Sequence, residues 1–136
     1  MKFDLSEIAP VNPGIVNLTI ERFRIFRELK LEGLGKVNLI TGHNNTGKSS
    51  VLEAVRILAL DSPPAMIHRI LTHREEDVFG REEPNRQGYT KTVLQISTLF
   101  HGFPKLSGFW EPIVVATDGH QQPMKLILTL DWFSEE

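Results

Sequence analysis

Hydrophobic and polar residues alternate over two short stretches near the start of the chain. Apolar residues occupy every second position from Val16 to Ile20, and again at Leu29 and Leu31, before two glycines. Such alternation is typical of strands with one buried face, so we expect an antiparallel hairpin. The apolar run 37–41 (VNLIT) then predicts a third strand, buried in a sheet, with the hairpin beside it.

The middle of the chain changes to helical spacing. Apolar residues recur every three or four positions over 48–60, and prolines at 63 and 64 are expected to end that helix. A second helix is predicted over 64–74. The charged stretch 75–90 contains glycines and a proline and predicts a long loop or lid. Residues 92–100 fit either a helix or a strand, and we favour a helix.

The last third returns to the spacing of strands. An apolar run covers 113–117, Asp118-Gly119 is a strong turn signal, and apolar residues alternate over 124–132. A second antiparallel hairpin is therefore expected, with Trp110 and Trp132 in packing roles. We expect residues 1–14 to be a flexible lead-in and residues 15–136 to form one folded unit.

One motif carries the chemistry of the chain. Residues 42–49 read GHNNTGKS and match the phosphate-binding pattern G-x-x-x-x-G-K-[ST], placed between a predicted strand and a predicted helix. Gly42 and Gly47 allow a tight turn that brings backbone N–H groups to phosphate oxygens at a helix N-terminus. Lys48 is expected to reach the β- and γ-phosphates as the catalytic cation, and the Ser49 hydroxyl to bind Mg²⁺.

The remaining positions of the motif are expected to shape the loop and to contact the nucleotide. These candidate cofactor-binding residues, with ATP and Mg²⁺ as the cofactors, are His43, Asn44, Asn45, Thr46 and Ser50. His68 and His73 are five positions apart, which does not place both on one helical face, so we do not expect a metal site there.

Composition limits the other classes of function. The chain has 136 residues, 40% of them hydrophobic, a net charge of −2 and no cysteine. The charge gives no electrostatic footprint for nucleic acid, and disulfides and thiolate metal sites are impossible. The sequence contains no apolar run long enough for a membrane span and no apolar signal core, so we expect a cytoplasmic protein without membrane contact.

The stretch 20–60 closely resembles the N-terminal segment of the RecF-like, SMC-like and overcoming-lysogenization-defect (OLD) ATPases of the AAA family, in its ABC-type branch. Three elements carry the resemblance: Arg22-Phe23-Arg24, which is similar to the family's N-F-R pattern; the G-x-N-N-x-G-K-S loop; and the continuation 50–54 (SVLEA). The stretch 99–102 (LFHG) also resembles a short segment of OLD-like members.

The resemblance implies an α/β fold, a P-loop NTPase lobe with a central sheet, a helix after the phosphate loop and flanking antiparallel β-hairpins. It implies that ATP is bound between this domain and a second copy in a head-to-tail dimer. It also implies that the full-length protein couples ATP to DNA transactions or phage defence. On this chain it makes Arg24 a candidate phosphate contact.

Several groups of a complete ATPase of this type have no clear place in the sequence. Asp118 and Asp131 each end an apolar run, but neither is followed by glutamate, and both lie in predicted hairpins. No D-x-D pair occurs, so no nuclease site is expected here, although a nuclease domain or DNA remains a candidate partner of the full-length protein. We expect the completing segments to lie outside this chain.

Two alternatives remain open at this point. One is a stand-alone P-loop kinase or small NTPase, which would need an aspartate or an arginine-rich lid near the acceptor. The region 69–86 supplies Arg69, Arg74, Arg81 and Arg86 without a recognisable pattern. The other is a non-catalytic module that responds to nucleotide by dimerising or by docking a partner.

Overall fold

The computed structural model describes residues 14–59, 63–73, 95–103, 109–118 and 123–130. Its sheet has four antiparallel strands in the order β2-β1-β3-β4. The strands are β1 (Asn17–Phe23), β2 (Phe26–Leu31), β3 (Ile113–Asp118) and β4 (Met124–Leu128). Both predicted hairpins are confirmed, and they meet along β1 and β3, where Ile20 pairs with Val115.

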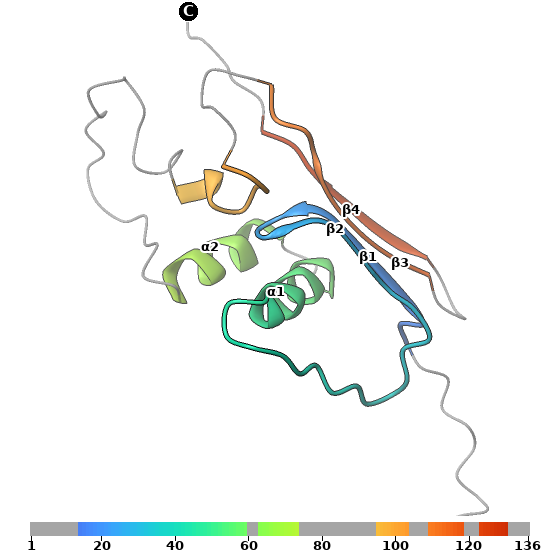
Figure 1. Ribbon diagram of the computed structural model, residues 1–136. Coiled ribbons are helices and arrows are strands. Elements are labelled where there is room, and N and C mark those ends of the chain that lie inside the picture. The colour runs from blue at the N-terminus through green and yellow to red at the C-terminus, as the bar shows by residue number, and fades with distance from the viewer. Residues whose placement is uncertain (1–13, 60–62, 74–94, 104–108, 119–122, 131–136) are drawn as a thin grey trace, which may run out of the picture.

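Two helices lie on one face of this sheet (Figure 1). Helix α1 (Lys48–Ala59) contacts β1, β3 and β4, and helix α2 (Pro63–His73) packs on α1. Both helices agree with the predicted ranges. The predicted helix over 92–100 is confirmed only at 95–97, because residues 98–99 form a turn and residues 92–94 lie outside the described part.

The core fills the space between the sheet and the helices. Leu18 and Ile20 of β1 are at most 2% exposed, as their alternation predicts. The alternation ends at Arg22, whose backbone has a left-handed φ of 56°, so that Phe23 rather than Arg22 turns into the core. The other buried apolar side chains come from α1, α2, β3 and the stretch 99–110.

The expected strand at 37–41 is wrong. These residues pair with no described strand, and Val37 and Leu39 are 92% and 88% exposed. Both neighbours of β1 are already provided by β2 and β3, so the segment runs past the outer side of α1 instead (Figure 1). A buried parallel strand needs neighbours on both sides, and no described strand is available to pair with 37–41. The expected central sheet is therefore not formed by the described residues.

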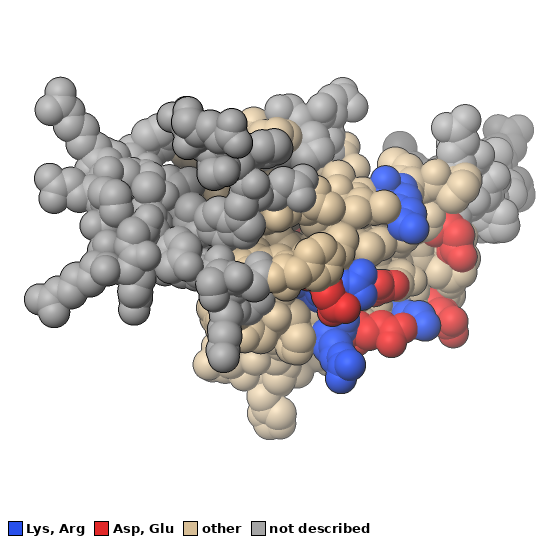
Figure 2. Space-filling model, turned by 90° about the horizontal axis from the view of Figure 1, so that it is seen from above, with Lys and Arg blue, Asp and Glu red and all other residues tan. Residues whose placement is uncertain are grey.

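Charged side chains of both signs are interleaved on the face shown in Figure 2, with no broad patch of one sign among the residues it describes. Two of the ion pairs are local, between Glu21 and Arg22 at 2.8 Å and between Glu28 and Lys30 at 2.6 Å. Within the described residues, no helix is long and apolar enough to cross a membrane.

The core assignment predicts a contrast between two phenylalanines. Phe23 is 1% exposed and Phe109 is 87% exposed. Phe23→Ala should lower the free energy of unfolding by about 3–5 kcal/mol, because it removes a buried ring and leaves a cavity. Phe109→Ala should change it by no more than about 0.5 kcal/mol. Urea unfolding of both variants measures the difference, and equal losses would contradict the fold.

Candidate nucleotide-binding site

The phosphate loop curls back on itself just before α1. Three of its residues adopt positive φ: Gly42 at 154°, Asn45 at 62° and Gly47 at 88°. Glycine takes such angles freely, and asparagine tolerates the left-handed region better than most residues. The glycine positions of the motif are thus required by the path of the backbone, and the loop ends where α1 begins, at Lys48.

The side chain of Lys48 is enclosed by the loop that precedes it. Its Nζ donates to the carbonyl oxygen of Gly42 at 2.8 Å and also to that of His43. The Thr46 hydroxyl donates to the same His43 carbonyl at 2.8 Å. These bonds hold the ammonium group at the centre of the loop, beside the N-terminus of α1, where backbone dipoles also favour an anion.

A hollow of about 800 Å³ opens beside this loop, and we call it the phosphate-loop hollow. Ser49 is exposed at its edge and Ser50 is buried. Gly42 and His43 are not part of its lining and contribute their carbonyl groups to Lys48 instead. The residues that line it are Ile25, Asn44, Asn45, Thr46, Gly47, Lys48, Ser49, Ser50 and Glu53.

The turn between β1 and β2 packs directly on the loop. A Cβ atom added to Gly47 would lie 2.5 Å from Cζ of Phe26 and 2.6 Å from Cδ1 of Ile25. Such distances are far inside van der Waals contact, so no side chain fits at position 47 without displacement. The turn therefore fixes how close the loop lies to the sheet.

Arg24 occupies this turn, and its side chain is buried rather than solvated. Its Nε lies 3.2 Å from Oε2 of Glu53, and the two side chains are 5% and 11% exposed. Its NH1 donates to both the hydroxyl and the carbonyl oxygen of Thr98, at 3.1 and 3.3 Å. Arg24 does not line the phosphate-loop hollow. Its assignment as a phosphate contact stays a prediction.

Glu53 is the residue of the site that sequence reasoning missed. It lies on the buried face of α1 with Ser50, Ala54 and Ile57, at the spacing of a single helical stripe. A carboxylate on a core-facing stripe needs a partner, because burying an unpaired charge is costly. The position of Glu53 on this stripe therefore indicates a buried ion pair from the sequence alone, although it does not identify Arg24 as the partner.

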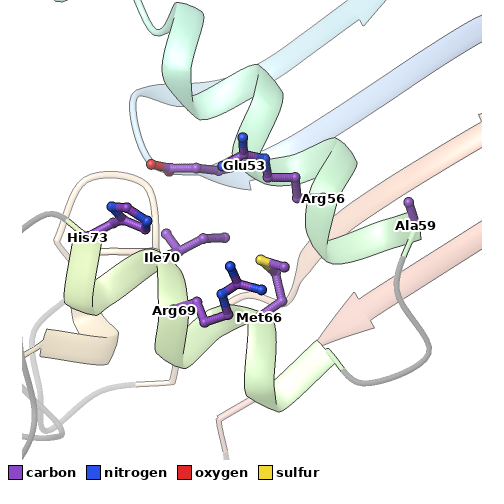
Figure 3. Close-up of a pocket in the computed structure, with 7 residues that line it drawn as sticks. All are labelled: Glu53, Arg56, Ala59, Met66, Arg69, Ile70 and His73. Atoms are coloured by element: carbon purple, nitrogen blue, oxygen red, sulfur yellow. The ribbon is translucent and has the colours of Figure 1, made fainter.

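A second hollow, of about 450 Å³, lies between α1 and α2. Figure 3 shows Glu53 and Arg56 of α1 facing Met66, Arg69 and other residues of α2. Glu53 lines this hollow as well as the phosphate-loop hollow. Glu53 thus lies between the two hollows, and its carboxylate is paired with Arg24.

The two aspartates, the two tryptophans and the charged stretch considered in the sequence analysis lie apart from the loop or outside the described residues. Asp118 is exposed at the end of β3, which is antiparallel to both of its neighbours and so lacks the parallel environment of a catalytic acidic strand. Asp131, Trp132 and the expected lid at 75–90 lie outside the described residues. Trp110 is 3% exposed and packs in the core, as expected.

The donor set at the loop fits a magnesium ion that arrives with phosphate. Mg²⁺ is usually held by one or two protein oxygens together with water and substrate phosphates. Ser49 offers one hydroxyl at the edge of the hollow. The described residues contain no group of three or more histidine, aspartate or glutamate side chains that could hold a metal ion without phosphate.

Comparison with known proteins agrees with this geometry. The family model described as "AAA domain" matches residues 17–96, which is more than half of the chain. The chain belongs to the AAA domain family. The matched region of this AAA domain includes β1, β2, the phosphate loop, α1 and α2.

Relatives of this AAA domain include named ATP-handling and DNA-repair proteins. An ATP/GTP phosphatase of Helicobacter pylori is 46% identical over 89 residues, which is 62% of this chain and 24% of the relative. The RecF protein of Lactobacillus gasseri, a "DNA replication and repair protein", is 35% identical over 83 residues, 60% of this chain and 21% of the relative. An uncharacterized protein of Methanocaldococcus jannaschii is 54% identical over 43 residues, 32% of this chain and 20% of the relative.

These matches confirm the resemblance to RecF-like ATPases of the AAA family and place the AAA domain in the P-loop class of ATPases. The chain spans a quarter or less of the length of these relatives. No solved structure is similar enough to the chain to count as a match.

The contact at Gly47 generates a prediction about stability. Gly47→Ala should lower the free energy of unfolding by about 1–3 kcal/mol, since it adds a methyl group to a filled space at a strained φ. Gly35→Ala is the matched control, because the nearest atom to its added Cβ would be 3.8 Å away. Urea unfolding of the two variants tests this, and an unchanged Gly47→Ala midpoint would show that the turn does not press on the loop.

Proposed function

We propose that residues 42–50 bind Mg-ATP, and that the chain is the nucleotide-binding part of a RecF-like ATPase. The observation that carries the proposal is the loop geometry: Gly42, Asn45 and Gly47 adopt positive φ, and the Lys48 ammonium at the N-terminus of α1 donates to the carbonyls of Gly42 and His43. Membership of the AAA family supports the same assignment. Lys48 binds the β- and γ-phosphates, Ser49 binds Mg²⁺, and the backbone of Asn44 to Gly47 contacts phosphate oxygens.

The exposure of the loop supports a second copy of the domain as the partner. Residues 41–46 are all exposed, and the lining of the phosphate-loop hollow comes from the loop, α1 and the β1–β2 turn. A phosphate bound there leaves its outer side open to a facing surface. We therefore propose that the full-length protein closes a head-to-tail dimer over ATP and uses this closure in DNA transactions or phage defence, in the cytoplasm.

The choice of base is a separate question, since one relative is named for both ATP and GTP. Calorimetric titration of the chain with ATP, GTP and ADP in the presence of Mg²⁺, together with its mass in solution, tests binding, base preference and dimerisation at once. Absence of binding by all three nucleotides would overturn the proposal. A stand-alone kinase is less supported, because the arginines in the region 69–86 follow no recognisable lid pattern.

The first prediction of this proposal concerns Lys48. Lys48→Ala should weaken ATP binding about ten- to a hundred-fold, because a charged hydrogen bond to phosphate contributes about 1.5–3 kcal/mol. Lys36→Ala is the matched control, since Lys36 is an exposed lysine of the preceding loop. Equal ATP affinities of wild type and Lys48→Ala in calorimetry would contradict the assignment of Lys48 as a phosphate ligand.

A second prediction concerns turnover. Phosphoryl transfer depends on positioning and on electrostatic stabilisation, including a group that orients water. Among the described residues, the one carboxylate that lines the phosphate-loop hollow is that of Glu53, which is paired with Arg24. The isolated chain should therefore release phosphate at a negligible steady-state rate. Robust turnover that Lys48→Ala abolishes would show instead that the chain contains a complete catalytic site.

A further inference from the structure

The β1–β2 turn is held between the phosphate loop and residues 95–101, which we call the 95–101 segment (Figure 1). On one side, Ile25 and Phe26 press on Gly47. On the other side, the backbone N–H of Arg24 donates to the carbonyl of Leu99 at 2.7 Å. One turn of the chain thus separates the nucleotide site from a segment about fifty residues further along.

The backbone of this turn is strained and firmly fixed. Arg24 has a φ of 53°, which is uncommon for a residue other than glycine and persists only where the surroundings enforce it. The surroundings do so through the 95–101 segment. The N–H of His101 donates to the carbonyl of Arg22 at 2.9 Å, and Nδ1 of the same histidine lies 3.0 Å from the carbonyl oxygen of Arg24.

The side chain of Arg24 completes the connection. Its guanidinium joins Glu53, five residues after Lys48 on α1, to the hydroxyl and carbonyl groups of Thr98. Removing one member of a buried charge pair leaves the other uncompensated, so these groups favour a single arrangement. The first turns of α1 and the 95–101 segment are therefore held in one relative position by Arg24.

We propose that Arg24 is a positioning residue for the nucleotide site, acting through Glu53 and not by touching phosphate. It fixes α1, and with it the phosphate loop, against the 95–101 segment. This rests on the proposed binding of nucleotide by residues 42–50. Arg24 does not line the phosphate-loop hollow, and its guanidinium already contacts Glu53 and Thr98.

The arrangement also couples the two ends of the link. If the position of the 95–101 segment affects nucleotide affinity, then nucleotide must affect that segment by the same free energy, because thermodynamic coupling is reciprocal. The chain contains a reporter for this effect. The ring of Trp110, 3% exposed, meets Phe100 edge to face at a centroid distance of 4.8 Å, and Phe100 forms a bridge with Phe23.

The test compares nucleotide affinity and tryptophan emission in a background carrying Trp132→Phe, which leaves Trp110 as the single tryptophan. Arg24→Lys and Glu53→Gln should each weaken ATP and ADP binding by the same factor, about two- to thirty-fold. Addition of ATP should change Trp110 emission in the parent, and both variants should reduce the amplitude of that change.

Thr98 provides the remote arm of the test and its matched control. Thr98→Val removes the hydroxyl that Arg24 contacts while preserving shape, and Thr98→Ser retains the hydroxyl. Thr98→Val should weaken the binding of both ATP and ADP and reduce the change in Trp110 emission. Thr98→Ser should keep the affinities and the emission change of the parent. Thermal unfolding without nucleotide shows whether Arg24→Lys and Glu53→Gln fold. If they do not fold, the Thr98 variants alone test the inference.

Three results would overturn the inference, and they are distinguishable. If Arg24→Lys weakens ATP but not ADP while Glu53→Gln changes neither, Arg24 contacts the γ-phosphate directly. If the variants lower the Tm but leave both affinities unchanged, measured well below the Tm, the link is only structural. In both cases the parent still binds nucleotide and the proposed function survives. If the parent binds no nucleotide, the proposed function and this inference fail together.

Discussion

The buried ion pair between Arg24 and Glu53 is the constraint on which the arrangement of the site depends. Taking both charges out of water costs several kcal/mol per ion, and only good geometry with further hydrogen bonds offsets that cost. The pair meets this condition because Thr98 accepts from the same guanidinium. Its net contribution to stability is therefore modest. Its effect is on position: α1, the β1–β2 turn and Thr98 fit together in the one arrangement that leaves no buried charge without a partner.

Close packing at Gly47 makes this constraint relevant to the phosphate loop. Ile25 and Phe26 occupy the space where a side chain at Gly47 would lie, and the Arg24–Glu53 pair joins the same turn to α1. Lys48 is held at both ends: loop carbonyls accept hydrogen bonds from its ammonium group, and its backbone forms the first residue of α1.

The elements that the sequence predicts well are those set by local spacing. The period of two at Leu18 and Ile20 and the helical period of α1 depend on neighbours a few residues away. Residues 37–41 have the same local signal as a buried strand and yet form none, because a strand also needs partners, and no described strand is free to pair with them. Local propensity cannot report on that requirement.

The residues of the site show the same difference between contacts that are local in the sequence and contacts that are distant. The loop residues that line the phosphate-loop hollow lie within a dozen positions, so a short motif reveals them. Arg24 was found through a resemblance, but its partners Glu53 and Thr98 are 29 and 74 positions away, and no spacing rule predicts such contacts. The phosphate-binding chemistry of the motif could therefore be derived from the sequence. The contacts that hold the loop and α1 in place could be found only in the structure.

The range of the family match includes Arg24 and Glu53 but not Thr98. The match begins at residue 17, the first residue of β1, and ends at residue 96, within the helical turn that precedes Thr98. Arg24 and Glu53 both lie inside it, together with the loop, whereas Thr98 and the β3–β4 hairpin lie beyond it. The Arg24–Glu53 pair thus lies within the region that the AAA domain model matches, and Thr98 contacts it from outside that region. If Arg24 positions α1 as proposed, a change at Thr98 reaches the phosphate loop without altering any residue of that loop, because the guanidinium that contacts Thr98 is also the partner of Glu53.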